Sequence, residues 1–264
     1  MKKVFNYPSC LESESRMYQD VKGTLSLAGL PKTLLYKIIL AISEGFTNAL
    51  IHGNKYNREK SIQISITINK RLVIADIMDE GAGNIEILRS RKAPDLFQEG
   101  GRGVDLMESL ADEIRFEKGQ NDSGLKISMI FDRSKYISDD YSLSDMEDKM
   151  EFRKKDAGST TVISMSGRLD LSNGGKLKEE IKNLLTSGKI SIHLNLGEVE
   201  FVNSSGLGAL VSMMKEIRIH RGRLTLSNLA DYVQEIFDIT QLSHIFEIYN
   251  SEEEALKSYS EITV

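Results

Sequence analysis

The feature that most limits the fold is a short acidic segment in the middle of the chain, residues 138–148, which reads SDDYSLSDMED. It has no basic residue and no sustained apolar period, which is typical of a linker. Its carboxylates are Asp139, Asp140, Asp145, Glu147 and Asp148. The 264 residues therefore divide into two parts, and at about 100–200 residues per domain each part has the length of a domain. We predict domains at residues 1–133 and 152–264, joined by a linker at 134–151.

The two parts differ in their apolar periodicity. Before the linker, the spacing of apolar residues predicts two helices and four strands around a glycine-rich region. The expected helices are 31–52 and 103–112, and the expected strands are 62–68, 71–78, 114–118 and 125–131. After the linker, expected strands alternate with expected helices as in an α/β layer. These strands are 160–166, 191–196 and 223–227, and these helices are 177–185, 207–218 and 232–237.

Composition and charge exclude several classes of protein. Hydrophobic residues make up 40% of the chain and charged residues 28%, with no tryptophan and 3 prolines, which excludes disordered and collagen-like chains. The 34 Lys and Arg against 39 Asp and Glu leave a net charge of −5, which argues against a general nucleic-acid or membrane-surface binder. A single cysteine, Cys10, favours a reducing compartment. No apolar run approaches the ~18 residues of a spanning helix, so we expect a cytoplasmic protein without nucleic-acid or membrane contacts.

The expected helix at 31–52 carries polar residues within an otherwise apolar pattern. Glu44, Asn48 and His52 are spaced four residues apart, so they lie along one side of the helix. A carboxylate next to an amide suits a general base beside an oxygen ligand for Mg²⁺, which takes hard oxygen donors. A solvated polar stripe explains the same spacing, and the motif taken alone fits that alternative better.

Two glycine-containing segments follow this helix. The segment D-E-G-A-G at 79–83 ends an expected strand, where Asp79 could accept a hydrogen bond from an exocyclic amine and the glycines allow close approach of a ligand. The segment G-G-R-G at 100–103 opens into an expected helix, where backbone N–H groups and Arg102 suit phosphates. A simple turn and a loop-to-helix junction explain each segment alone. The order and spacing of the three motifs together favour a nucleotide site.

Motifs of other phosphoryl-transfer proteins are missing from the sequence. It has no G-x-x-x-x-G-K-[ST] segment and no H-R-D and D-F-G pair. The histidines offer no phosphoacceptor on a dimerisation helix ahead of the three motifs, so we do not expect autophosphorylation on histidine.

Two serines stand at an expected strand-to-helix turn in the second part. The apolar run at 199–202 leads into N-S-S-G at 203–206, after which a helical period begins. Serine is favoured as a helix cap, and a phosphate added at a helix N-terminus is stabilised by the helix dipole. Ser204 and Ser205 therefore fit either a capping role or a phosphorylation site.

The first part resembles a known family in three blocks. E-G-F-T-N-A-L-I-H at 44–52, D-E-G-A-G at 79–83 and G-G-R-G-V at 100–104 are similar to the N, G1 and G2 boxes of the GHKL ATPase superfamily, and most similar to those of the anti-sigma-factor serine kinases. The resemblance covers roughly residues 5–133. It implies ATP and Mg²⁺ as cofactors, with Glu44 as catalytic base, Asn48 as Mg²⁺ ligand and Asp79 as the adenine contact. The further nucleotide contacts that it implies are Gly81, Gly83, Gly101, Arg102 and Gly103.

One residue departs from this family pattern near the adenine contact. The family's later Gly-Thr pair is Gly124-Leu125 in this chain. The difference removes a hydroxyl that the resemblance places near adenine.

The second part resembles the STAS fold of anti-sigma-factor antagonists over roughly residues 152–260. The similar segments are F-V-N-S-S-G-L-G-A-L at 201–210 and G-R-L-D-L-S at 167–172. The resemblance implies a mixed sheet with helices and a phosphoacceptor at Ser204, with Ser205 as the alternative. Asn203 stands where the family usually has Asp, which removes one negative charge beside the acceptor.

Together the resemblances imply an α/β protein, an α+β-sandwich GHKL domain followed by a STAS domain, that regulates sigma-factor-type signalling by partner switching. The expected partners are a sigma factor or other anti-sigma and antagonist proteins, and we also expect a homodimer. A flexible linker of about twenty residues reaches roughly 25 Å, which gives a near-millimolar effective concentration for docking within one chain. A non-catalytic nucleotide-binding adaptor stays open as an alternative. A structural protein with coincidental motifs has less support.

Overall fold

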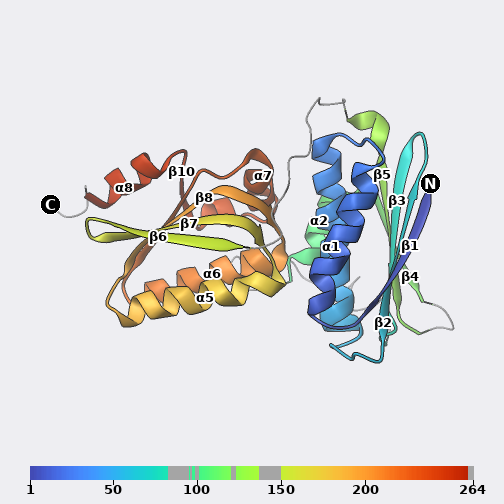
Figure 1. The fold of residues 1–264 in the computed structure, drawn as a ribbon, viewed down its shortest axis with the longest axis horizontal. Helices are drawn as coiled ribbons and strands as arrows, with labels where there is room; N and C mark the ends of the chain where they lie inside the picture. Colours follow the sequence, from blue (N-terminus) through green and yellow to red (C-terminus); the bar gives the residue numbers. More distant parts are fainter. Residues whose placement is uncertain (83–94, 96, 99–100, 120–122, 137–149, 261–264) are drawn as a thin grey trace. The chain divides into compact units, whose positions relative to one another are not determined.

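The computed structural model describes residues 1–82, 95, 97–98, 101–119, 123–136 and 150–260. Its contacts divide the chain into two compact units, each of which is described separately. The elements before residue 137 form the first unit and those after residue 149 form the second (Figure 1). Most of the expected linker lies outside the described residues, so the exact domain boundaries stay a prediction.

The first unit contains an antiparallel sheet in the order β1-β2-β3-β5-β4. Its strands are β1 (Lys2–Pro8), β2 (Ser61–Ile68), β3 (Leu72–Met78), β4 (Glu113–Lys118) and β5 (Leu125–Asp132). Isoleucines at alternate positions of β2 are buried against the helices, from Ile62 to Ile68. This alternation is expected for a sheet that helices cover on one face, because successive side chains point to opposite sides.

Helices lie on one side of this sheet in the described part of the chain (Figure 1). They are α1 (Glu12–Ser26), α2 (Lys32–Asn48) and α4 (Gly103–Leu110). The central helix is α2, which contacts α1, α4 and β3 and buries apolar side chains such as Ile38, Ile42 and Phe46. Its wide apolar face provides most of the core between helices and sheet.

After Asn48, α2 continues into the π-helical turn η1 (Ala49–Gly53). The amide of Asn54 donates to the carbonyl of Ala49 at 2.7 Å, which is the i→i+5 spacing of a π-turn. The combined helix Lys32–Gly53 has the length and apolar composition needed to cross a membrane, and 78% of its most apolar window is buried inside the unit. Such burial is typical of the core helix of a folded domain.

The second unit contains a sheet in the order β10-β9-β8-β7-β6. Its strands are β6 (Glu151–Ala157), β7 (Thr160–Leu169), β8 (Ser191–Val202), β9 (Arg223–Ser227) and β10 (Glu247–Tyr249). Neighbouring strands from β7 to β10 are parallel, and the edge strand β6 is antiparallel to β7. The sheet is therefore mixed, as expected from the resemblance.

Helices alternate with the parallel strands of this sheet. They are α5 (Leu171–Thr186), α6 (Ser204–Ile219), α7 (Asp231–Ile239) and α8 (Glu252–Ser260). Figure 1 shows α5 and α6 side by side on one face of the sheet, where their apolar residues form the main core. The α/β alternation expected from the sequence is confirmed.

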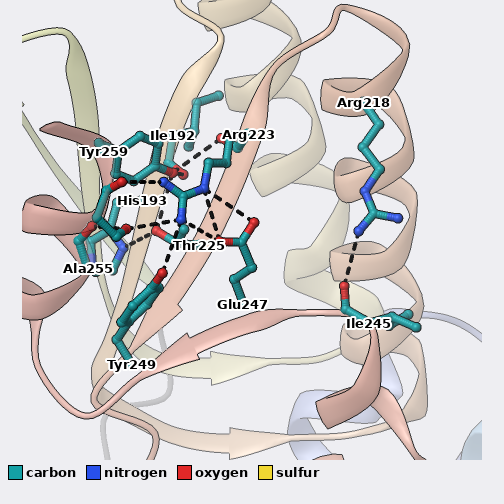
Figure 2. A network of polar contacts seen from close by, with 11 residues as sticks. Ile192, His193, Arg218, Arg223, Thr225, Ile245, Glu247, Tyr249, Ala255 and Tyr259 are labelled. Atoms are coloured by element: carbon teal, nitrogen blue, oxygen red, sulfur yellow. Dashed lines mark hydrogen bonds and ion pairs between the residues drawn. The ribbon is translucent and has the colours of Figure 1, made fainter. Parts of the chain in front are cut away.

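A polar network fastens the last helix, α8, to the sheet (Figure 2). The guanidinium of Arg223 on β9 lies 4.5 Å from the centre of the Tyr259 ring and donates to the hydroxyl of Tyr249 at 3.0 Å. The hydroxyl of Tyr259 donates to the carbonyl of Ile192 at 2.6 Å and accepts from Thr225 Oγ1 at 3.2 Å. Side chains from β9, β10 and α8 therefore meet at one point.

His193 lies beside this network and is fully buried. Its ring nitrogens are 2.8 Å from Thr225 Oγ1 and 2.9 Å from Ser227 Oγ, both on the neighbouring strand β9. Burial lowers the pKa of His193 to about 4, because a charged ring would lose its hydration there. The histidine is a structural group of the core that links two parallel strands.

Candidate nucleotide-binding and phosphoacceptor sites

The structure brings the first sequence motif into contact with the start of α4. Glu44 is buried and Asn48 is half-buried, one helical turn apart on α2. A Cβ atom on Gly103, the first residue of α4, would lie 2.6 Å from Glu44 Oε2 and 3.4 Å from Asn48 Nδ2. A side chain at position 103 would displace the Glu44 carboxylate, so the N-terminus of α4 directly faces the carboxylate and the amide.

The amide group of Asn48 has unused hydrogen-bonding capacity. Its Nδ2 atom is buried and has no hydrogen-bond partner in the described part of the chain. A buried donor without a partner carries a free-energy cost of about 1–3 kcal/mol. A phosphate oxygen between α2 and α4 would accept from Nδ2 and remove that cost, and the Oδ1 atom of the same amide is the type of oxygen ligand that Mg²⁺ takes. The residues present therefore fit a bound phosphate with its cation.

His52 does not extend this pair. The π-turn η1 begins directly after Asn48, so residues 49–53 leave the α-helical register on which the spacing of four was based. His52 is exposed in this turn. The expected alignment therefore holds for Glu44 and Asn48 and fails for His52.

Asp79 stands at the end of β3 in a closely packed turn. Its side chain is 5% exposed, and its Oδ1 atom accepts hydrogen bonds from the amides of Gly81 at 2.7 Å and Leu125 at 3.2 Å. Burial raises the pKa of Asp79, while these two hydrogen bonds oppose the shift. The amide of Gly124 donates to the carbonyl of Gly81 at 2.8 Å, which joins the turn to the start of β5.

The third motif forms the entry to α4. Arg102 is the N-cap residue and is 3% exposed, and Gly101 before it has a positive φ of 93° that favours glycine. The backbone N–H groups of the first turn of α4 therefore follow a glycine turn, a geometry suited to anions. Gly83 and Gly100 lie outside the described residues.

Sequence reasoning missed two residues that hold the Asp79 turn in place. Asn54 accepts the amide of Glu80 at 2.9 Å and donates to the carbonyl of Ser61 at 2.8 Å. Gly53 packs against the carboxyl group of Asp79, where a Cβ atom would lie 2.6 Å from Oδ2. The only sequence signal was the pair Gly53-Asn54 directly after the helix motif, because the contacts themselves depend on the tertiary fold.

In the second unit, Asn203 is the N-cap residue of α6. It is fully buried, and its Oδ1 atom accepts the amide of Gly206 at 3.0 Å. Ser204 and Ser205 follow it in the first helical turn and are half-buried. The side-chain cap is therefore supplied by Asn203, so capping does not explain why two serines occupy these positions.

The start of α6 adjoins the start of α5. The amide of Asn203 donates to the carbonyl of Leu169 at 3.2 Å, and the register pairs Leu169 with Val202 at the carboxyl ends of β7 and β8. Asp170 caps α5 by accepting the amides of Ser172 and Asn173. The two helix N-termini thus lie at the same edge of the sheet.

The two folds and their sites define a class of protein, an ATPase-like domain joined to a STAS domain. Residues 7–131 match the histidine kinase-like ATPase domain family, and residues 151–255 match the STAS domain family. The chain belongs to the family of sigma-factor partner-switching proteins that contain these two domains.

Relatives of known name match each half. The anti-sigma-B factor antagonist of Listeria monocytogenes is 31% identical over 109 residues, which are 41% of this chain and 95% of that protein. The anti-sigma F factor of Bacillus licheniformis is 31% identical over 124 residues, which are 44% of this chain and 84% of that protein. A solved anti-sigma factor antagonist from Mycobacterium paratuberculosis is 21% identical with a TM-score of 0.39, covering 42% of this chain and 93% of that chain.

Proposed function

We propose that the chain is a serine protein kinase of sigma-factor partner switching that carries a substrate-like STAS domain. The observation that carries the proposal is the approach of the α4 N-terminus to Glu44 and Asn48, which Gly103 allows. A helix N-terminus attracts phosphate groups, so the terminal phosphate of ATP would lie beside a buried carboxylate. The similarity to an anti-sigma F factor and to an anti-sigma-B factor antagonist supports joining both roles in one chain.

The proposed nucleotide contacts come from the three sequence motifs, and the positions of Asp79 and Asn48 support two of them. Asp79 would accept the exocyclic amine of adenine, and Asn48 would hold Mg²⁺ together with phosphate oxygens. In the described part of the chain, no group of three or more His, Cys, Asp or Glu could hold a metal ion by itself. A cation that depends on nucleotide phosphates fits that finding. The remaining proposed contacts are Gly81, Gly83, Gly101, Arg102 and Gly103.

The proposed transfer uses Glu44 as the general base. The acceptor hydroxyl attacks the terminal phosphorus of ATP, so an oxygen–phosphorus bond forms to serine while the bond to the β-phosphate oxygen breaks and ADP leaves. The hydroxyl proton passes to the Glu44 carboxylate. Mg²⁺ supplies electrostatic stabilisation of the phosphate charge when it is bound.

Ser204 is the proposed acceptor, with Ser205 as the alternative. A phosphate would add about −1.5 to −2 charges at the start of α6. Such a charge changes which partner surface can dock there. The proposed partners are a sigma factor and other anti-sigma or antagonist proteins, in the cytoplasm. We also propose that the STAS domain docks on the kinase domain of its own chain and that the chain forms a homodimer.

Intact-mass measurement after incubation with Mg²⁺ and ATP tests the transfer. Wild-type chain should gain one phosphate, Ser204→Ala should gain none, and Ser205→Ala should behave as wild type. If Ser205→Ala alone blocks the gain, the acceptor is Ser205. If ATP binds but neither the chain nor a related antagonist supplied as substrate gains phosphate, the chain is a nucleotide-binding adaptor.

A mixing experiment with full-length chains separates transfer within one chain from transfer between chains. Glu44→Gln keeps the acceptor and loses the base, whereas Ser204→Ala keeps the base and loses the acceptor. Phosphate on the Glu44→Gln chain in the mixture would require transfer between chains. Transfer occurs within one chain if neither variant in the mixture gains phosphate and a separate sample of wild-type chain is modified at a rate independent of its concentration.

A further inference from the structure

Gly53, the last residue of the π-turn η1, lies against the carboxyl group of Asp79. A Cβ atom on Gly53 would lie 2.6 Å from both Cγ and Oδ2 of Asp79 and 2.9 Å from Oδ1. The φ of Gly53 is not in the positive region, so its backbone conformation suits any residue. The need for glycine arises from the close approach to the carboxyl group alone.

Gly81 makes a second close contact with the end of the π-turn η1. A Cβ atom on Gly81 would lie 2.4 Å from the carbonyl oxygen of Gly53. Gly81 also donates its amide to Asp79 Oδ1 at 2.7 Å, and Leu125 donates to the same oxygen at 3.2 Å. The carboxyl group is thus held by two hydrogen bonds to one oxygen and by the backbone of Gly53.

The π-turn allows the chain segment that begins with α2 to contact both the start of α4 and Asp79. Glu44 and Asn48 precede the turn and face α4, whereas Gly53 ends the turn and faces Asp79, the residue directly after β3. Asn54, next in the chain, accepts the amide of Glu80 and so fastens the end of the turn to the Asp79 loop. The widened turn lets the chain leave the α4 side and reach Asp79 within a few residues.

We infer that Gly53 is a positioning residue that sets the selectivity of the site for a purine carrying an exocyclic amine, because it fixes the orientation of the Asp79 carboxylate. This inference rests on the proposed nucleotide site. A methyl group at position 53 displaces the carboxylate and weakens its hydrogen bond to the amine. The atoms nearest to this methyl group all belong to Asp79, so the proposed phosphate contacts at the start of α4 are not displaced.

Two nucleotides measure this effect. ATP carries the exocyclic amine, and purine riboside triphosphate lacks it but has the same ring system and phosphates. Wild-type chain should bind ATP about tenfold or more tightly than purine riboside triphosphate, since the buried acceptor then loses its partner. Gly53→Ala should lower the affinity for ATP by a similar factor and leave the affinity for purine riboside triphosphate nearly unchanged.

Gly23→Ala is the matched control. Gly23 lies in α1, where a Cβ atom would meet nothing within 4 Å. The same chemical change there should leave both affinities as in wild type. Asn54→Ala is a second variant, which removes the acceptor for the amide of Glu80 and so releases the end of the π-turn from the Asp79 loop. It should reduce the preference for ATP in the same way.

The outcomes distinguish this inference from the proposed function. If wild-type chain binds ATP and purine riboside triphosphate equally, the assignment of Asp79 to the adenine amine is wrong. If wild-type chain prefers ATP and the folded Gly53→Ala and Asn54→Ala variants keep that preference, the role of Gly53 is wrong. If Gly53→Ala loses affinity for both nucleotides equally, Gly53 supports only the fold, which also overturns the inference.

Discussion

Arg168 and Asp170 form an ion pair inside the second unit, with side chains that are 1% and 0% exposed. Asp170 also caps α5, and the guanidinium of Arg168 lies 5.7 Å from the centre of the Phe201 ring. Removal of one member of a buried pair leaves an uncompensated charge in the core. The pair therefore controls the stability of the edge at which α5 and α6 begin.

Asp170→Ala should lower the free energy of unfolding by about 3–5 kcal/mol, because it strands the charge of Arg168 and removes the helix cap. Urea denaturation of the full chain measures the change. Glu180→Ala removes the half-buried partner of the exposed Lys154 and should cost less than about 1 kcal/mol. Equal losses in the two variants would contradict the structural role of the buried pair.

The stability of the second unit should depend on pH through His193. Its folded pKa is about 4 and its ordinary value is 6.5, so below pH 6.5 the unfolded chain takes up a proton that the folded chain excludes. The contribution of His193 to the free energy of unfolding is therefore full above pH 6.5 and falls by about 3 kcal/mol as the pH drops to 4.

Urea titrations between pH 7 and pH 4 measure this dependence. Glu252 and Lys155 are the charged groups whose fields act on His193, in opposite directions. His193→Gln should flatten the profile, and His220→Gln controls for loss of an exposed histidine. An unchanged profile in His193→Gln would exclude this assignment.

Asp79→Asn should weaken ATP binding by about tenfold or more, because an amide NH₂ group in place of Oδ2 is a donor. Two donors would then face each other, and the hydrogen bond to the adenine amine would be lost. Isothermal titration with ATP and Mg²⁺ measures the affinity. Asp76→Asn is the matched control, three residues earlier in β3 on the face away from the helices, where it accepts the hydroxyl of Ser128. Absence of any binding heat with wild-type chain would refute the nucleotide site itself.

Glu44→Gln should separate binding from transfer. The neutral amide cannot take the acceptor proton, so phosphate incorporation should fall about 100-fold or more, while ATP affinity stays within about twofold. Phosphate incorporation is followed by mass spectrometry and affinity by titration. Glu108→Gln, an exposed site on α4, is the control. Full activity in Glu44→Gln would mean that another group acts as the base.

The main helices could be predicted because their apolar residues repeat at a helical period. The long helix at 31–52 corresponds to α2 with η1, and the helix after the two serines corresponds to α6. The motif positions of Asp79 and Gly103 were also placed correctly, at a strand end and at a helix start. Local pattern was sufficient wherever burial on one face determined the element.

Several edge elements could not be predicted from apolar pattern, although the edge strand β4 was expected at 114–118. β6 reads EFRKKDA and β1 begins with two lysines, because edge strands carry charged residues on their free sides. Helix α1 was missed because it buries polar residues, including Glu14 at 0% exposed. Strand β10 has three residues and α8 begins with three glutamates, so neither shows an apolar period.

The π-turn and its contacts could not be predicted either. The turn depends on i→i+5 hydrogen bonds such as the one from Asn54 to Ala49, and on the contact between Gly53 and Asp79, which are far apart in sequence. No periodicity in the sequence encodes these tertiary relations. The motif residues were therefore found, and their supporting residues were not.

The residues on either side of the two serines in the first turn of α6 both contact Leu169. Asn203 before the serines donates its amide to Leu169, and a Cβ atom on Gly206 after them would lie 2.2 Å from the Leu169 carbonyl oxygen. A segment held in this way cannot be drawn out as an extended strand without breaking the sheet edge. An enzyme that modifies Ser204 must therefore recognise an intact folded surface. A short peptide with the same sequence does not present that surface and should be a poor substrate.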